Sequence, residues 1–132
     1  MNQYIITLKT DGPIAEIGLF NKDQALDYFK YEHLNQLSEN LLIEIEKLFR
    51  KNKLKFSDLF GINVYQGPGS FTGLRIGISL ANALSYSLNI PIIGSAQENW
   101  IKSGINELLK AKNQKIVIPE YGALPHITKA KK

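Results

Sequence analysis

The chain has 132 residues, 44% of them apolar and 21% charged, which is enough for one globular domain with its own core. The absence of cysteine excludes disulfides and thiolate metal sites, and the two histidines, His33 and His126, have no metal-ligand spacing. No apolar run reaches the roughly 18 residues of a membrane span. No secretion signal is evident either, so we expect a cytoplasmic protein without membrane contact.

The chain is mildly basic, with a formal net charge of +4. Much of the excess lies in two clusters, residues 47–55 and the final residues 129–132. Such clusters allow contact with nucleic acid, but a solvated helix end and a loose tail explain them about as well.

The first part of the chain predicts a three-stranded antiparallel meander. Residues 4–8, 14–20 and 25–31 are short runs with β-branched and aromatic side chains or with alternating polarity. Turn signals separate them, Asp11-Gly12-Pro13 after the first run and Asn21-Lys22-Asp23 after the second.

From residue 34 the hydrophobic period changes to that of helices. Apolar residues recur every three or four positions over residues 34–49, which predicts an amphipathic helix. Polarity and turn residues then predict, in chain order, a strand at 60–66, a glycine-rich loop, a helix at 71–88, a strand at 92–94, a helix at 96–112 capped by Ser95, a strand or extended segment at 115–118, and a basic tail at 119–132.

The glycine-rich loop between the predicted strand and helix is a candidate binding element. Its glycines permit unusual backbone angles, and a helix N-terminus beside it favours negative charge. Neither a Walker A ending nor GxGxxG spacing is present, so an anion cradle and a tight structural turn both stay open. The loop motif comprises Gly67, Pro68, Gly69, Ser70, Phe71, Thr72 and Arg75, with Ser70 and Thr72 as candidate capping residues.

The helix after this loop has two stripes with a spacing of four. One consists of small residues, and its two glycines cost helix stability relative to alanine unless another backbone approaches closely. The other consists of Ile76, Leu80 and Leu84. Packing on the chain's own sheet explains only one of these stripes, so the second favours a partner. The small residues are Gly73, Gly77, Ala81 and Ser85.

The element order βββ-α-β-α-β-α predicts an α/β domain over residues 1–118, built on a mixed sheet of about five strands. This is the plan of a ribonuclease H-like half-domain of the kind found in actin and sugar kinases.

Residues 67–77, with the sequence GPGSFTGLRIG, resemble the signature of the TsaB (YeaZ) family. The similarity extends over most of residues 4–109, with His33 at the position of the family's His-Ser pair. Residues 89–95, Pro119-Glu120-Tyr121 and residues 127–132 also resemble family segments.

The resemblance implies a role in the synthesis of the threonylcarbamoyladenosine (t6A) of tRNA. TsaB-like proteins are non-catalytic scaffolds that pair with and activate the transferase TsaD, and the ATPase TsaE joins the pair. The resemblance therefore implies a TsaD-like and a TsaE-like partner, tRNA contact only through the complex, and no cofactor or metal. Alone, the chain is expected to form a homodimer through the same surface.

Pairing in the family uses the two helices of the first half-domain, here residues 34–49 and 71–88. The residues expected at this surface are Leu34, Leu37, Leu41, Ile45, Gly73, Gly77, Ala81 and Ser85.

Two departures from the family pattern bear on function. Lys9 lies where the family has an aspartate, and an ammonium cannot ligate a cation. The family also has a second half-domain of about a hundred residues, most of which this sequence lacks. We therefore expect a shortened scaffold.

Two alternatives stay open. One is RNA binding through residues 47–55 and the lysine tail, and the other is nucleotide binding by the loop at residues 67–73. Catalysis by the chain alone is disfavoured, because Ser70 has no histidine near it in sequence.

Overall fold

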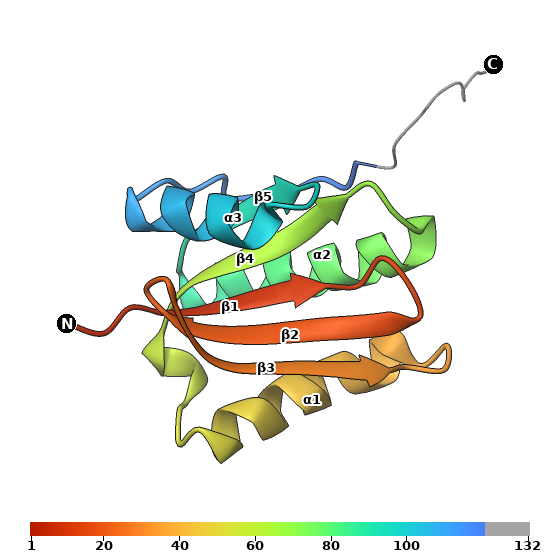
Figure 1. Ribbon diagram of the computed structural model, residues 1–132, viewed down its shortest axis with the longest axis horizontal. Coiled ribbons are helices and arrows are strands. Elements are labelled where there is room, and N and C mark those ends of the chain that lie inside the picture. Colours follow the sequence, from red (N-terminus) through yellow and green to blue (C-terminus); the bar gives the residue numbers. More distant parts are fainter. Residues whose placement is uncertain (121–132) are drawn as a thin grey trace.

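A five-stranded mixed sheet forms the centre of the computed structural model, which describes residues 1–120 (Figure 1). The strand order is β3-β2-β1-β4-β5. Strands β1, β2 and β3 pair antiparallel, whereas β4 runs parallel to both β1 and β5. The predicted meander and mixed sheet are confirmed. The strands are β1 (Tyr4–Lys9), β2 (Ile14–Asn21), β3 (Gln24–Glu32), β4 (Leu59–Gly67) and β5 (Ile92–Ala96).

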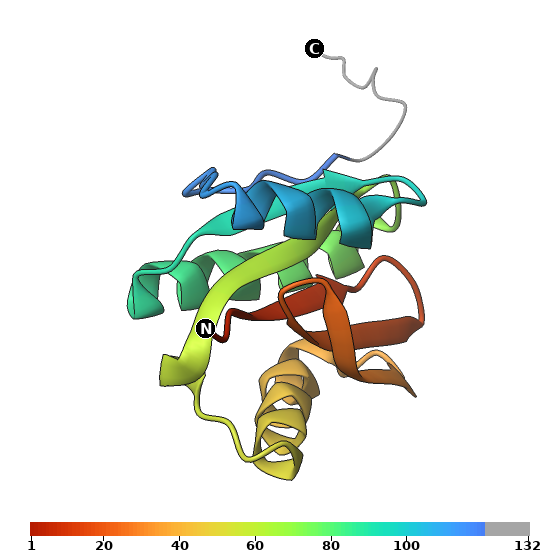
Figure 2. The same cartoon turned by 60° about the vertical axis from the view of Figure 1, so that its left-hand side comes forward.

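Helices cover both faces of the sheet. Helices α1 (Leu37–Lys51) and α2 (Phe71–Leu88) lie side by side on one face, and α3 (Trp100–Leu109) lies on the other (Figures 1 and 2). A short 3-10 helix, η1 (Phe56–Asp58), precedes β4. Within residues 1–120, no helix combines the length and apolar character needed to cross a membrane.

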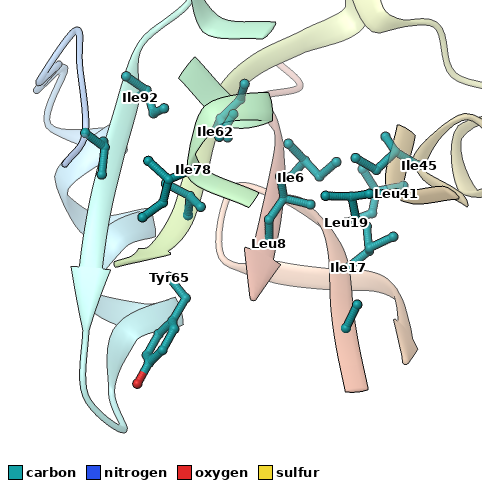
Figure 3. Close-up of a cluster of buried hydrophobic side chains, with 14 of the residues drawn as sticks. Ile6, Leu8, Ile17, Leu19, Leu41, Ile45, Ile62, Tyr65, Ile78 and Ile92 are labelled. Carbon is teal, nitrogen blue, oxygen red and sulfur yellow. The ribbon is translucent and has the colours of Figure 1, made fainter. Parts of the chain in front are cut away.

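Alternation along the strands divides the core into two clusters. Ile6 and Leu8 of β1 point towards α1 and α2, where they meet side chains such as Leu41 and Ile78 (Figure 3). Ile5, one position earlier, belongs to the smaller cluster that packs under Ile105 of α3.

Two helices begin later than predicted. Leu34 and Asn35 have φ angles of 52° and 63°, so the backbone is left-handed there and α1 begins only at Leu37. Ser95 does not cap a helix, because it lies in β5 and its hydroxyl donates to Asn63 Oδ1 at 2.7 Å. Helix α3 accordingly begins at Trp100.

Residues 110–120 form no strand, and the chain bends at residues 115–116, where Lys115 has a left-handed φ of 69°, so the predicted strand or extended segment at 115–118 does not form as a whole. The predicted basic tail falls almost entirely at residues 121–132, outside the described residues.

Candidate partner-binding surface

The small-residue stripe of α2 faces the chain's own sheet. A Cβ atom added at Gly73 would fall on the Thr10 carbonyl, and one added at Gly77 would fall on the Thr10 hydroxyl. The Thr10 hydroxyl also donates to the Gly73 carbonyl at 2.7 Å. Ala81 and Ser85 are buried. The close approach that compensates these glycines is therefore supplied within the domain, which corrects their expected place at a partner surface.

The predicted stripe of α1 is internal as well. Leu37, Leu41 and Ile45 are buried in the main core, where they pack under β1 and β2. Leu34 precedes the helix and is 70% exposed. Of the expected contact residues on this side, only Leu34 is accessible, and it lies outside the helix.

A different set of apolar residues lies outward on the two helices. Ile76, Leu80 and Leu84 are only partly buried, and Ala83 beside them is exposed. On α1, Leu42 is 39% exposed. Ser38 of α1 and Ile76 of α2 line the same cleft, so the side of α1 that carries Ser38 is turned towards α2. Leu42 lies four residues after Ser38 and therefore on that same side of α1. We call these residues the helix-pair surface: Leu42, Ile76, Leu80, Ala83 and Leu84.

The glycine-rich loop is a tight turn closed by the β1–β2 connection. Gly67 has a φ of 129°, and the Gly67–Pro68 bond is cis. A Cβ at Gly69 would fall on the Asp11 side chain, and the Ser70 amide donates to the Asp11 carbonyl at 3.0 Å. The predicted Ser70 cap is absent, since its side chain makes no capping hydrogen bond. An acidic side chain against the loop disfavours the anion cradle.

A cleft of about 500 Å³ separates the starts of α1 and α2. His33 and Ser70 both line it, but His33 Nε2 lies 2.8 Å from the Gly12 carbonyl, and no hydrogen bond joins it to Ser70 within the described part of the chain. His33 Nδ1 is buried without a partner. The cleft therefore lacks a connected nucleophile and base.

Arg75 and Phe71 lie beside this cleft at the start of α2. The Arg75 guanidinium lies 5.2 Å from the centre of the Phe71 ring, and both side chains are exposed. The guanidinium therefore packs on an aromatic ring of its own helix, and its expected place in the loop motif stays a prediction.

Lys9 forms an ion pair within the domain. Its ammonium lies 2.6 Å from Asp11 Oδ1 and 4.7 Å from the centre of the Tyr65 ring. Residues 1–120 contain no group of three or more acidic or histidine side chains that could hold a metal ion.

The basic cluster at the end of α1 is partly neutralised. Lys47 pairs with Glu44 at 3.5 Å, and Lys51 pairs with Asp27 at 3.2 Å. Hydrogen bonds from Asn52 and Lys51 lower the pKa of Asp27 below its usual value. Burial, with Glu44 nearby, raises the pKa of Tyr31 to about 12. These contacts join α1 to β3 and leave less positive charge for a ligand.

A group of amide side chains beside β5 was not expected from the sequence pattern. Asn82 of α2 and Gln66 of β4 bond the backbone of residues 117–120. The one feature of the sequence that could have indicated it is Asn82, an amide on α2, which is otherwise rich in small and aliphatic residues.

A family model described as TsaD, tRNA N6-adenosine threonylcarbamoyltransferase, matches residues 33–121. The chain belongs to the TsaB/TsaD family. TsaB of Buchnera aphidicola (subspecies of Schizaphis graminum) is 37% identical over 102 residues, which cover 67% of this chain and 49% of the relative. TsaB of Escherichia coli is 28% identical over 116 residues, covering 81% of this chain and 48% of that protein.

A threonylcarbamoyltransferase of Bacillus subtilis is 43% identical over 56 residues, 42% of this chain and 16% of the transferase. The TsaB matches extend over more of the chain, so the predicted TsaB (YeaZ) resemblance is confirmed. The chain spans about half the length of these TsaB relatives.

The solved structure of YeaZ from Pseudomonas aeruginosa superposes with a TM-score of 0.66 at 23% identity. The alignment covers 71% of this chain and 44% of YeaZ, and it confirms the ribonuclease H-like fold.

Proposed function

We propose that this chain is a non-catalytic scaffold subunit in t6A synthesis that pairs with a TsaD-type transferase and activates it. Relatives that match most of the chain are named as t6A biosynthesis proteins. In this role the chain acts in the cytoplasm, a TsaE-type ATPase joins the pair, and tRNA is reached through the complex.

The observation that carries the proposal is the helix-pair surface. Its members come from two adjacent helices on one face of the sheet, and Leu80 and Leu84 among them are only partly buried. Adjacent amphipathic helices with an exposed apolar flank are suited to pack against two helices of another protein. The pairing surface is therefore the seam and outer side of α1 and α2, and the buried small-residue stripe supports it from beneath.

The non-catalytic role is supported by the polar groups around the loop. His33 is engaged by a backbone carbonyl, and Lys9 and Asp11 satisfy each other. Neither contact provides an activated nucleophile.

The two alternatives have weaker support. RNA binding would rely on a cluster in which Lys47 and Lys51 are already paired with acids. Nucleotide binding would require phosphate to approach a loop that Asp11 lies against. Salt-dependent tRNA binding by the isolated chain, or heat on titration with ATP or ADP, would favour one of them instead.

The deciding experiment is co-expression with the TsaD-like protein of the same source. We expect the two proteins to co-purify and t6A in tRNA, measured by mass spectrometry of nucleosides, to depend on both. Ala83→Glu places a charge on the helix-pair surface and should abolish co-purification. Ser103→Glu, an exposed change on α3, is the matched control and should leave it intact.

If the TsaD-like protein still co-purifies with Ala83→Glu and with Leu80→Glu, it binds outside the helix-pair surface. Sedimentation at several concentrations gives the state of the isolated chain. Self-association that the same two variants abolish would show that copies of the chain meet through this surface.

A further inference from the structure

The segment after α3 follows the outer edge of β5 back to the glycine-rich loop (Figure 1). It covers the edge by side-chain and backbone bonds in place of a regular ladder. The Ile92 amide donates to Asn113 Oδ1 at 3.0 Å, and the Gln114 amide donates to the Ile92 carbonyl at 2.9 Å. The Gly94 amide donates to Gln114 Oε1 at 2.6 Å. The sheet edge is therefore closed by the chain itself.

Val117 anchors the middle of this segment to α2. Its side chain is 2% exposed, and both its backbone groups bond to one amide side chain. The Val117 amide donates to Asn82 Oδ1 at 2.9 Å, and Asn82 Nδ2 donates to the Val117 carbonyl at 3.0 Å. A Cβ atom at Gly94 would approach Val117 Cγ1 to 2.6 Å, so the glycine leaves room for the anchor.

The far end of the segment rests on the loop that leads into α2. Gln66 Nε2 donates to the Ile118 carbonyl at 2.7 Å, and the Glu120 amide donates to the Gln66 carbonyl at 2.8 Å. The Glu120 carbonyl lies where a side chain of Gly67 would be. Residues 117–120 thus contact both the middle of α2, through Asn82, and the start of the glycine-rich loop, through Gln66 and Gly67.

We propose that Asn82 and Gln66 are positioning residues that, through the 113–120 segment, fix the glycine-rich loop and the first turns of α2 for partner pairing. This inference rests on the proposed function. Other hydrogen bonds also hold the loop: the Ser70 amide donates to the Asp11 carbonyl, the Tyr65 hydroxyl donates to the Pro68 carbonyl at 2.8 Å, and the Gln97 amide donates to the Gly67 carbonyl at 3.3 Å. The contacts of Gln66 and Gly67 with residues 118–120 add to these bonds and connect the loop to the 113–120 segment.

Fixing the loop and the start of α2 should strengthen partner binding, because these elements then need not be ordered when the partner binds. A surface that is fixed before binding loses less conformational freedom on association than one that must be ordered by the partner. Asn82 lies on the flank of α2 towards β5, whereas the helix-pair surface lies on the flank towards α1. A change at Asn82 therefore affects pairing without touching the partner.

Hydrogen exchange of the full chain, read by NMR for single amides, tests the proposal. Asn82→Asp keeps the size of the side chain but sets a carboxylate against the Val117 carbonyl. We expect the Val117 and Glu120 amides, and with them the Ser70 amide, to exchange about tenfold faster or more, while the β1 and β2 amides keep their protection. Val117→Ala, a milder change, should act in the same direction. Asn106→Asp, exposed on α3, is the control for the added charge.

Pairing with the TsaD-like protein is measured on the same variants, and we expect it to weaken about tenfold in Asn82→Asp. Faster exchange at Val117 and Glu120 with an unchanged Ser70 amide would overturn the proposal, as would low protection of these amides in the wild type. A loosened loop with unchanged pairing would overturn the link to binding. Absence of pairing in the wild type would instead reject the proposed function.

Discussion

The two sides of α2 have the same four-residue spacing, but one packs against the sheet and the other is partly exposed beside α1. Gly73 and Gly77 lie against the end of β1, where Thr10 comes so close that no larger side chain fits. Ile76 and Leu80 lie on the flank next to α1 and are only partly covered. Residue volume therefore indicates which side meets the sheet, because a backbone can approach only over small residues. An apolar stripe that stays partly exposed is the better indicator of a partner.

The largest expected effect comes from enlarging the inner side. Gly77→Leu drives a side chain into the Thr10 hydroxyl and should destabilise the fold by about 3 kcal/mol, at the upper end for an overpacked core. Urea denaturation measures the change. Ala83→Leu adds similar bulk on the outer side and should stay within about 0.5 kcal/mol of the wild type. Equal losses in the two variants would mean that the two sides are not distinct.

A substitution in α3 tests whether packing is equally close on the opposite face of the sheet. A Cβ atom at Gly104 of α3 would fall on the buried Asn63 side chain. Gly104→Ala should therefore cost about 2 kcal/mol, although alanine favours a helix over glycine. A stabilised variant in thermal denaturation would show that Asn63 can move aside without loss.

Substitutions on the outer side of α2 should change the affinity for the partner more than the stability of the fold. Leu80→Ser shortens a partly buried side chain of the helix-pair surface and should weaken pairing by about tenfold, equivalent to about 1.4 kcal/mol. Calorimetry or surface plasmon resonance with the purified TsaD-like partner measures the affinity. Circular dichroism at the working temperature confirms that the variant is folded. An unchanged affinity would place the partner on another surface.

The smallest effect concerns the polar contact at the end of α1. Asn52 Nδ2 donates to Asp27 Oδ2 at 3.0 Å and is the main cause of the lowered pKa of Asp27. A carboxyl whose pKa is lower in the folded state stabilises the fold above its unfolded pKa of about 4, and that stabilisation disappears as pH falls through the folded pKa. The difference in unfolding free energy between wild type and Asn52→Ala should thus be larger at pH 7 than at pH 2.5.

A pH series of urea denaturations measures that difference. Asp27→Asn provides the control, since it removes the titrating group and should make the effect of Asn52→Ala independent of pH. A constant difference between wild type and Asn52→Ala would contradict the role of the Asn52 hydrogen bond.

The sequence predicted the sheet better than the ends of the helices. Strands β1 to β4 follow from local alternation, turn residues and apolar runs, which act over short distances. The start of α1 was misplaced because Leu34 continues the apolar period, although its own backbone is left-handed. Ser95 resembled a helix cap, but a buried bond to Asn63 holds it in β5.

The candidate surface was predicted as a pair of helices, but its residues were not. Periodicity groups Gly77 with Ala81 and Ile76 with Leu80, yet it does not say where the sheet lies. That depends on Thr10, which is far away in the sequence and contacts α2 only in the folded domain. The contacts of residues 113–120 were missed for the same reason, because Asn82 and Gln66 recognise backbone groups, which leave no pattern in the side chains.

The contact of Thr10 with Gly73 and Gly77 has a consequence for how such domains diverge. Thr10 and the two glycines, which lie more than sixty residues later in the chain, share one small volume, so a change at any of them limits what the others can become. We expect homologues that gain a methyl group at position 77 to carry glycine or alanine at position 10. A library that randomises these positions together should recover folded combinations that one-at-a-time mutagenesis never reaches.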